Sequence, residues 1–254
     1  MCRRRVCTYK TAAGRGILIP IMANGFEIEI KSLLGSAENA DVLRKKLLQK
    51  SDCVKTGGNS QLNHYFTGGD AQSLLNAVSD KFSGEHKERL ASILGRAKNV
   101  SVRTREYNGK VLLVVKATVD DTTSSNGTAR EEFEEEPSRF NLNERLNLTL
   151  DELDKLLLGA GFEYQAKWSR QREEYKSSDI AITIDKNAGY GYLAEFEKIV
   201  PEASLADETK MKLRAFMKEL GAEELPQDRL ERMFAHYNAH WAEYYGTDRV
   251  FTIL

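Results

Sequence analysis

The sequence has 254 residues, of which 41% are hydrophobic and 30% are charged, and its mean hydropathy is -0.49. This composition excludes disordered and membrane-spanning classes and predicts a soluble globular protein with one main core. The formal net charge is -1, so we expect no nucleic-acid partner and no membrane partner. Three cysteines without metal-ligand spacing favour neither a disulfide framework nor a zinc site, and a cytoplasmic location is expected.

The first 22 residues are expected to be a leader that does not belong to the fold. Basic residues at Arg3, Arg4 and Arg5 precede a short apolar stretch, which superficially resembles a signal peptide. The stretch contains Pro20 and is too short for a signal-peptide hydrophobic region.

Strands and helices alternate in the first part of the chain. Apolar and polar residues alternate over 26–31, which predicts a strand, and Ser36 then opens an amphipathic helix. A short aromatic strand is expected over 62–67. Helical spacing covers 70–97, with an interruption expected at Gly84.

A β-hairpin is predicted in the middle of the chain. The β-rich segments 100–106 and 110–119 flank an Asn-Gly pair, which is the strongest short hairpin signal. The polar stretch 120–129 predicts a loop, and a charged strand is expected to follow over 130–136.

The second half begins with a helix whose first turn is specified by a capping box. Thr149 and Glu152 have the spacing for this box, and the helix is expected to end near Gly159 or Gly161. Three strands and two helices complete the chain, and they are predicted at 164–175, 179–186, 192–199, 207–220 and 227–245.

Charged residues recur with a period of two on these predicted strands. Residues i and i+2 of a strand share a face, so each strand has one apolar face and one charged face. One such strand alone fits an ordinary solvent-facing sheet better than a binding site. The pattern recurs, however, at Glu27, Glu29 and Lys31; Arg103 and Arg105; Lys110 and Lys116; Arg130, Glu132 and Glu134; Arg170 and Arg172; Asp185; and Glu195 and Glu197.

Two architectures fit this pattern. In an open sheet the charged face meets water, whereas in a closed antiparallel β-barrel it lines the interior and must be satisfied by ligands or opposite charges. We favour the barrel because the helices predicted between strands can cover the apolar outer faces. Cations in its interior would bind phosphate oxygens, and glutamates would hold a hard divalent metal.

The order of these charged segments resembles the CYTH superfamily, also called triphosphate tunnel metalloenzymes. The resemblance covers roughly residues 25–200 and is carried by the segments EIEIK, RTR, VVK, REEFEE, RQR, TIDK and AEFEK. It implies an α+β fold in which a closed eight-stranded antiparallel barrel, or tunnel, has helices packed outside. The chain is accordingly divided into a leader at 1–22, a tunnel barrel at 23–200 and C-terminal helices at 201–254.

The resemblance also implies roles for the charged residues and a cofactor, Mg²⁺ or Mn²⁺. The residues expected to bind metal are Glu27, Glu29, Glu132, Glu134, Glu195 and Glu197. Those expected to contact a triphosphate substrate are Lys31, Arg103, Arg105, Lys116, Arg170 and Arg172. Those expected to take part in catalysis are Glu27, Glu29, Lys31 and Asp185.

Three functions remain open on the sequence alone. The first is metal-dependent hydrolysis of inorganic triphosphate, thiamine triphosphate or a nucleoside triphosphate. The second is the class IV type of adenylate cyclase, which converts ATP to cyclic AMP and pyrophosphate, and the third is a noncatalytic phosphate or nucleotide sensor. A homodimer is compatible with each.

The pair His236 and His240 lacks the context of a zinc motif, so packing or surface roles are expected.

Overall fold

The computed structural model describes residues 26–118, 130–141 and 144–253, and these form an α+β fold with an eight-stranded antiparallel sheet. The strands of this sheet are β1 (Phe26–Gly35), β2 (Cys53–Gly68), β3 (Asn99–Tyr107), β4 (Lys110–Thr118), β5 (Arg130–Glu135), β8 (Phe162–Ser177), β9 (Ile180–Asn187) and β10 (Gly191–Val200). A separate hairpin consists of β6 (Ser138–Asn141) and β7 (Glu144–Asn147). The described α-helices are α1 (Ala37–Gln49), α2 (Ala71–Val78), α3 (Gly84–Arg96), α4 (Leu150–Gly159), α5 (Ala206–Glu219) and α6 (Gln227–Tyr244).

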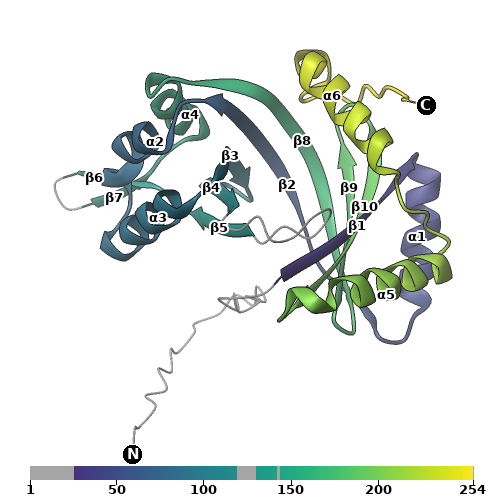
Figure 1. The fold of residues 1–254 in the computed structure, drawn as a ribbon. Coiled ribbons are helices and arrows are strands. Elements are labelled where there is room, and N and C mark those ends of the chain that lie inside the picture. Colours follow the sequence, from purple (N-terminus) through teal and green to yellow (C-terminus); the bar gives the residue numbers. More distant parts are fainter. Residues whose placement is uncertain (1–25, 119–129, 142–143, 254) are drawn as a thin grey trace, which may run out of the picture.

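The strands follow the order β1-β10-β9-β8-β2-β3-β4-β5 and curl into a deeply concave sheet. Figure 1 shows β2 and β8 arching over β3, β4 and β5, with β1 at the opposite edge. Within the described residues, β1 pairs only with β10 and β5 only with β4. The prediction of an eight-stranded antiparallel sheet is therefore confirmed, but hydrogen bonds do not close it, so the closed barrel is not confirmed.

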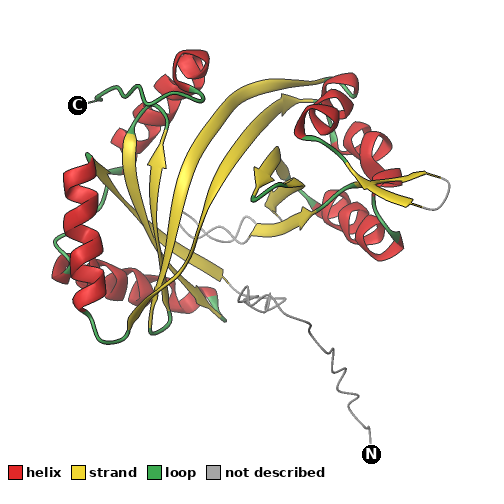
Figure 2. Ribbon diagram, turned by 180° about the vertical axis from the view of Figure 1, so that it is seen from behind, coloured by secondary structure: helices red, strands yellow, loops and turns green. Residues whose placement is uncertain are grey.

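Helices cover the outer, convex face of the sheet at its two ends (Figure 2). One apolar cluster lies beneath α2, α3 and α4 and includes Phe133 and Leu113, and another lies beneath α1 and α5 and includes Phe196 and Ile28. These four side chains are at most 1% exposed, and each contributes about 1.5–3 kcal/mol on burial. Because the apolar side chains of each strand are used on this face, the charged ones are left for the concave face.

The C-terminal helix α6 packs at the end of β8 through an aromatic cluster. Trp168 of β8 lies 4.0 Å from Tyr237 between ring centroids, and it also makes edge contacts with Tyr190 and Phe234. The Tyr237 hydroxyl donates to the backbone carbonyl of Lys167 at 2.8 Å. The helix is thus fixed against the rim of the concave face.

The local signals of the sequence are confirmed where they rest on backbone chemistry. Asn108 and Gly109 both adopt positive φ angles, 49° and 76°, as a tight hairpin turn requires. Thr149 and Glu152 form the capping box of α4. The interruption near Gly84 is also present, since α2 ends at Val78 and α3 begins at Gly84.

Other segments differ from the prediction or lie outside the described residues. Strand β2 begins at Cys53 rather than at Leu62, because its polar first half pairs with β8 instead of burying an apolar face. The β6–β7 hairpin was not predicted. The expected leader at 1–22 and the loop at 120–129 both lie outside the described residues.

Candidate functional site

The concave face gathers the charged residues that share a strand face in the sequence. Strand pairing places Lys31 opposite Glu195 and Glu29 opposite Glu197, while Arg172 lies opposite Asp185. The described members of this cluster on the concave face are Glu29, Lys31, Arg103, Arg105, Lys116, Glu134, Arg170, Arg172, Asp185, Glu195 and Glu197. The side chains of Glu27 and Glu132 lie outside the described set.

One half of the cluster is a continuous chain of ion pairs. Lys31 Nζ binds Glu29 and also Glu195, the latter at 2.8 Å, and Arg172 Nη2 binds the other oxygen of Glu195 at 2.6 Å. Arg172 also makes two contacts with Asp185, at 2.7 and 2.6 Å. Asp185 is fully buried and receives Arg170 Nη1 at 3.1 Å. This carboxylate therefore holds two guanidinium groups side by side.

The cations of this chain determine the ionisation of its central acid. Burial alone would raise the pKa of the Glu195 carboxyl, but Lys31, Arg172 and Arg170 outweigh burial and hold this pKa well below its usual range. Glu195 is thus a carboxylate at every physiological pH, which is the state that a metal ligand requires.

The other half of the cluster lies on β2, β3 and β5. Arg105 donates through Nε to Asn63 at 2.8 Å and through Nη1 to Glu134 at 2.7 Å, while Arg103 Nη1 binds the Tyr65 hydroxyl at 2.6 Å. Burial, and then the charge of Arg103, lowers the pKa of Arg105 to about 10. The charged form of Arg105 therefore costs free energy in the folded protein, and a bound anion would offset this cost.

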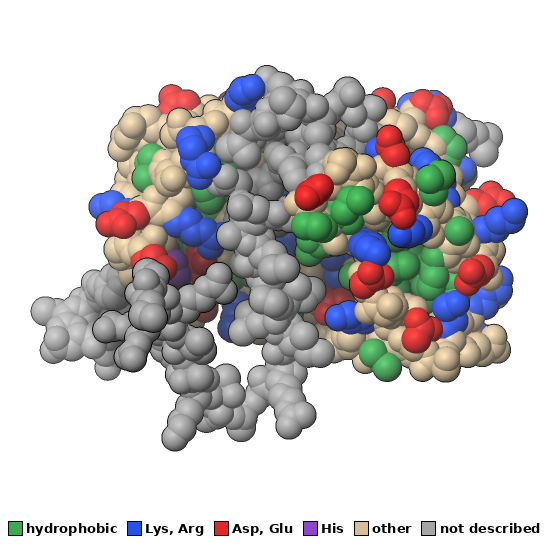
Figure 3. Space-filling model, turned by 60° about the horizontal axis from the view of Figure 1, so that its bottom comes forward, with side chains coloured by type: hydrophobic (Ala, Val, Ile, Leu, Met, Phe, Trp, Pro, Cys, Tyr) green, Lys and Arg blue, Asp and Glu red, His purple; other side chains and the backbone are tan. Residues whose placement is uncertain are grey.

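A cavity of 400 Å³ opens between these two halves. Arg105 of β3 and Arg172 of β8 both line it, and its other lining residues are Gln61, Tyr107, Lys110, Leu112, Glu134 and Glu174. The mixture of guanidinium groups with carboxylates at its wall fits a polyanion that is accompanied by a cation. The face of the molecule that Figure 3 shows intersperses acidic and basic side chains where it is described, in keeping with the net charge of -1.

The uncharged polar side chains of β2 are site residues that were not predicted from the sequence. Asn59, Gln61, Asn63 and Tyr65 share the concave face, and Gln61 and Asn63 are only 5% and 3% exposed. Their alternation over 59–65 was the available signal. This signal is weak because uncharged amides carry no part of the charge pattern that marks the other strands.

The carboxylates of β1 and β10 are the candidate ligands for a divalent metal. Glu29 and Glu197 are direct cross-strand neighbours, and Glu195 lies one step along the same face, so three carboxylates, the ligand type that a hard cation prefers, lie in one region of the sheet. Among the described residues, however, no group of three or more acids, histidines or cysteines is already arranged around one point. Lys31 instead bridges Glu29 and Glu195, which fits a site whose carboxylates need a cation.

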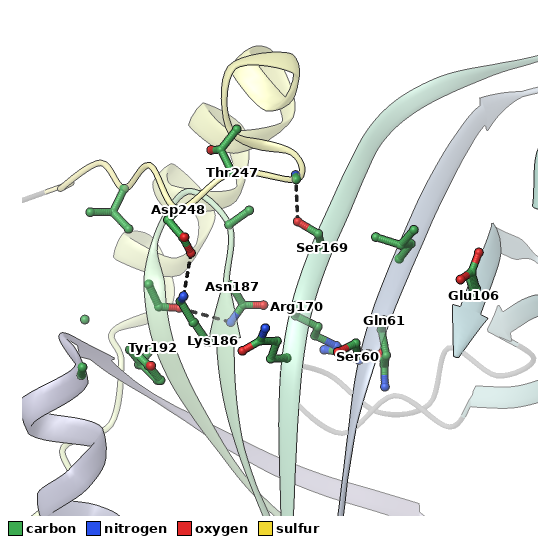
Figure 4. A pocket seen from close by; sticks show the side chains of 18 residues that line it. Ser60, Gln61, Glu106, Ser169, Arg170, Lys186, Asn187, Tyr192, Thr247 and Asp248 are labelled. Carbon is green, nitrogen blue, oxygen red and sulfur yellow. Dashed lines mark hydrogen bonds and ion pairs between the residues drawn. The ribbon is translucent and has the colours of Figure 1, made fainter. Parts of the chain in front are cut away.

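A larger cavity of 680 Å³ is lined by residues from both faces of these strands, including Gln61 and Arg170 of the concave face and Gln171 and Lys186 of the convex face. Figure 4 shows it between β8, β9 and the segment that follows α6, with Lys186 paired to Asp248 at 2.6 Å and Ser169 accepting from the Gly246 amide at 3.0 Å. The predicted site residues that line it are limited to Arg170. We therefore assign the concave face, rather than this cavity, as the candidate site.

The histidine pair on α6 does not contribute to the candidate site. His236 and His240 stack at 4.4 Å between ring centroids, and the first also packs on Phe251. His240 Nδ1 is hydrogen-bonded to the His236 carbonyl at 2.9 Å. The expected packing role of the pair is therefore in keeping with its contacts.

Comparison with protein-family models shows to which family the chain belongs. The family model described as "CYTH domain" matches residues 92–229, which is more than half of the chain. The chain belongs to the CYTH domain family. The family resemblance of the sequence is thus confirmed, although the matched range does not include the EIEIK segment of β1. A search of curated proteins gave no significant match.

Solved structures share the fold of this CYTH protein at low sequence identity. The PH1819 protein of Pyrococcus horikoshii OT3 has a TM-score of 0.51 at 20% identity, and the match covers 83% of this chain and 98% of that one. The PH1012 protein of the same organism also has a TM-score of 0.51, at 16% identity, and the match covers 78% of this chain and 91% of that one. A Vibrio parahaemolyticus protein described as a "putative adenylate cyclase" gives 0.51 at 16% identity, and the match covers 84% and 99% of the two chains. No described helix is long and apolar enough to cross a membrane.

Proposed function

We propose that this CYTH protein is a metal-dependent enzyme that hydrolyses a triphosphate, either inorganic or carried by an organic group such as thiamine or a nucleoside. The observation that carries the proposal is the concave face itself. Four arginines and Lys31 gather there beside carboxylates on neighbouring strands, and two of these arginines, Arg105 and Arg172, line a 400 Å³ cavity. A triphosphate with a divalent metal has the complementary charges.

The arginines and lysines bind and orient the phosphate groups in this proposal. Guanidinium groups donate two parallel hydrogen bonds to phosphate oxygens, which fixes both position and direction. Arg105 and Arg172 line the cavity from β3 and β8, the two strands that flank β2, and would contact different phosphates of the substrate. Arg103, Arg170, Lys31 and Lys116 lie on the same concave face, and Asp185 positions Arg170 and Arg172.

The carboxylates of β1 and β10 hold the metal in this proposal. Glu29, Glu195 and Glu197 are the proposed ligands on these two strands, with Glu27, Glu132 and Glu134 as further ones. A bound Mg²⁺ or Mn²⁺ would neutralise phosphate oxygens and lower the pKa of a water molecule. Lys31 would then move from the carboxylates towards the phosphate oxygens.

The proposed reaction is in-line displacement at the terminal phosphorus. The oxygen of a water molecule forms a bond to this phosphorus while the bond to the bridging oxygen breaks, and the electron pair leaves with the diphosphate portion. The proton lost by the water is released to solvent. Arg105 and Arg172 stabilise the charge that develops on the phosphate oxygens.

Adenylate cyclisation is the second candidate. The Vibrio parahaemolyticus neighbour is described as a "putative adenylate cyclase", and this observation favours the alternative. In that reaction the ribose 3′ oxygen attacks the α-phosphorus of ATP and pyrophosphate leaves. The same cations would bind the triphosphate, so the two reactions differ in the phosphorus that is attacked.

A matched pair of lysine variants tests the proposal. Lys31→Gln removes a cation from the concave face, whereas Lys186→Gln removes one from the convex face of the same sheet, where Lys186 pairs with Asp248. We expect wild type and Lys186→Gln to release orthophosphate from inorganic triphosphate with Mg²⁺ or Mn²⁺. Lys31→Gln should lose about tenfold or more in kcat/KM. Equal rates for the two folded variants would contradict the assignment of the concave face.

A further inference from the structure

The concave face of β2 has three uncharged carboxamides in a row, which are here called the amide ladder and consist of Asn59, Gln61 and Asn63. Asn63 Nδ2 donates to Gln61 Oε1 at 3.4 Å, and Gln61 Nε2 donates to Asn59 Oδ1 at 2.8 Å. Asn59 Nδ2 then donates to Glu174 Oε1 at 2.9 Å. The ladder therefore runs along the strand and ends on a carboxylate.

Two arginines of the candidate site dock on this ladder. Arg105 Nε donates to Asn63 Oδ1 at 2.8 Å, and Arg170 Nε donates to Gln61 Oε1 at 2.9 Å. Each guanidinium thus uses its Nε to bind an amide oxygen of β2. Such a bond fixes the plane of the guanidinium and leaves its Nη groups directed away from the strand.

The two ends of the ladder determine the orientation of every amide. Arginine can only donate hydrogen bonds, so the oxygens of Asn63 and Gln61 must face Arg105 and Arg170. Glu174 as a carboxylate can only accept, so the nitrogen of Asn59 must face it. All amides consequently point the same way, and bonds aligned in one direction polarise and strengthen one another.

Neutral amides differ from carboxylates in their effect on the charge of the site. Arg172 is bound by Asp185 and Glu195, which offset its charge within the protein. An amide oxygen orients a guanidinium equally well but adds no negative charge. Arg170 already pairs with Asp185, and Arg105 already pairs with Glu134. The amides of β2 therefore align both arginines without adding further negative charge, and more of their positive charge stays available to an anion on the concave face.

We propose that Gln61 and Asn63 are positioning residues, which orient Arg170 and Arg105 towards a triphosphate without adding negative charge to that of Asp185 and Glu134. This inference rests on the proposed function of the concave face. According to this inference, the triphosphate binds more tightly because the side chains of Gln61 and Asn63 carry no negative charge. A carboxylate at either position would keep the bond to arginine but reduce the binding of the triphosphate.

The substitutions Gln61→Glu and Gln61→Met separate charge from hydrogen bonding. Binding of inorganic triphosphate is measured by calorimetry in EDTA, so that no turnover occurs. We expect Gln61→Glu to weaken binding by about tenfold or more, because the new acid adds a second negative charge beside Arg170, which already pairs with Asp185. Gln61→Met should weaken it less, because Arg170 loses its alignment but keeps its charge. A purely structural role predicts the opposite order, since glutamate keeps the acceptor and methionine does not.

The matched control is Gln171→Glu, which adds the same acid to the neighbouring position on the exposed convex face of β8. It should change the dissociation constant by no more than about twofold. Asn63→Asp repeats the test at Arg105 and decides the matter if Gln61→Glu does not fold. The positioning role is overturned if Gln61→Glu binds inorganic triphosphate as tightly as Gln61→Met does. It is also overturned if Gln171→Glu weakens this binding as much as Gln61→Glu does. Wild type that binds no triphosphate would overturn the proposed function together with this inference.

Discussion

Removal of the Arg105 side chain should weaken triphosphate binding while the fold survives. Arg105 has 11% of its side chain exposed and lines the 400 Å³ cavity, so Arg105→Ala enlarges an existing space instead of creating a closed hole. Its Nη1 partner Glu134 is 36% exposed and can regain water. Its Nε partner Asn63 is buried and loses one hydrogen bond.

The expected magnitudes follow from these contacts. One lost hydrogen bond at Asn63 costs about 1 kcal/mol of unfolding free energy. This cost is offset in part because burial and Arg103 disfavour the charged form of Arg105, as its lowered pKa of about 10 indicates. The melting temperature should fall by no more than roughly 2–4 °C. A charged hydrogen bond to substrate is worth about 1.5–3 kcal/mol, so kcat/KM should fall by about ten- to a hundredfold.

The assay compares Arg105→Ala with the control variant Arg214→Ala. Arg214 lies on the outer helix α5, and its guanidinium forms an exposed ion pair with Glu224. Thermal melts and the metal dependence of orthophosphate release are measured for both variants. The control should match wild type, and Arg105→Ala should lose substrate affinity at an unchanged metal requirement. A folded Arg105→Ala protein with wild-type kcat/KM would refute the reasoning.

Further predictions concern the metal ligands, the acid stability and the buried network under α4. Glu29→Gln should lower activity by about tenfold or more and recover in part at higher Mn²⁺, which a metal titration at fixed substrate checks. Because the folded pKa of Glu195 is lowered, its contribution to stability is present above its unfolded pKa and is lost as the pH falls through the folded value. Urea unfolding of Glu195→Gln from pH 7 to pH 3 should therefore show a smaller loss of stability on acidification than wild type does, and identical slopes would contradict this. Asp154 is 1% exposed and accepts hydrogen bonds from Thr104 and Tyr164, at 2.6 and 2.7 Å, so Asp154→Asn should cost about 1–3 kcal/mol in urea unfolding, and an unchanged midpoint would count against the network.

The sequence predicted the elements whose signals are local. The hairpin at Asn108 and Gly109 needs two positive φ angles, and the capping box of Thr149 and Glu152 satisfies backbone groups within one turn. Such features depend on neighbouring residues alone. The alternation of charged and apolar residues likewise predicted which side chains share the concave face.

Features that depend on distant partners were not predictable in the same way. The first half of β2 is polar and contains Gly57 and Gly58, yet it forms a strand because β8 pairs with it along its length. The closure of the sheet depends on whether β1 meets β5, which no local pattern encodes. Gln61 and Asn63 were missed because their importance comes from Arg170 and Arg105 on other strands. The domain division, the site roles and the homodimer stay predictions.

Identification of the products by phosphorus NMR tests the central claim most directly. Wild type is incubated with Mg²⁺ or Mn²⁺ and, in separate samples, inorganic triphosphate, thiamine triphosphate and ATP, with EDTA samples as controls. We predict that at least one substrate yields orthophosphate and the corresponding diphosphate, in a reaction that EDTA abolishes and Lys31→Gln slows. Cyclic AMP with pyrophosphate from ATP would contradict hydrolysis in favour of cyclisation. A folded protein that leaves all three substrates unchanged with both metals would contradict a triphosphate-processing enzyme.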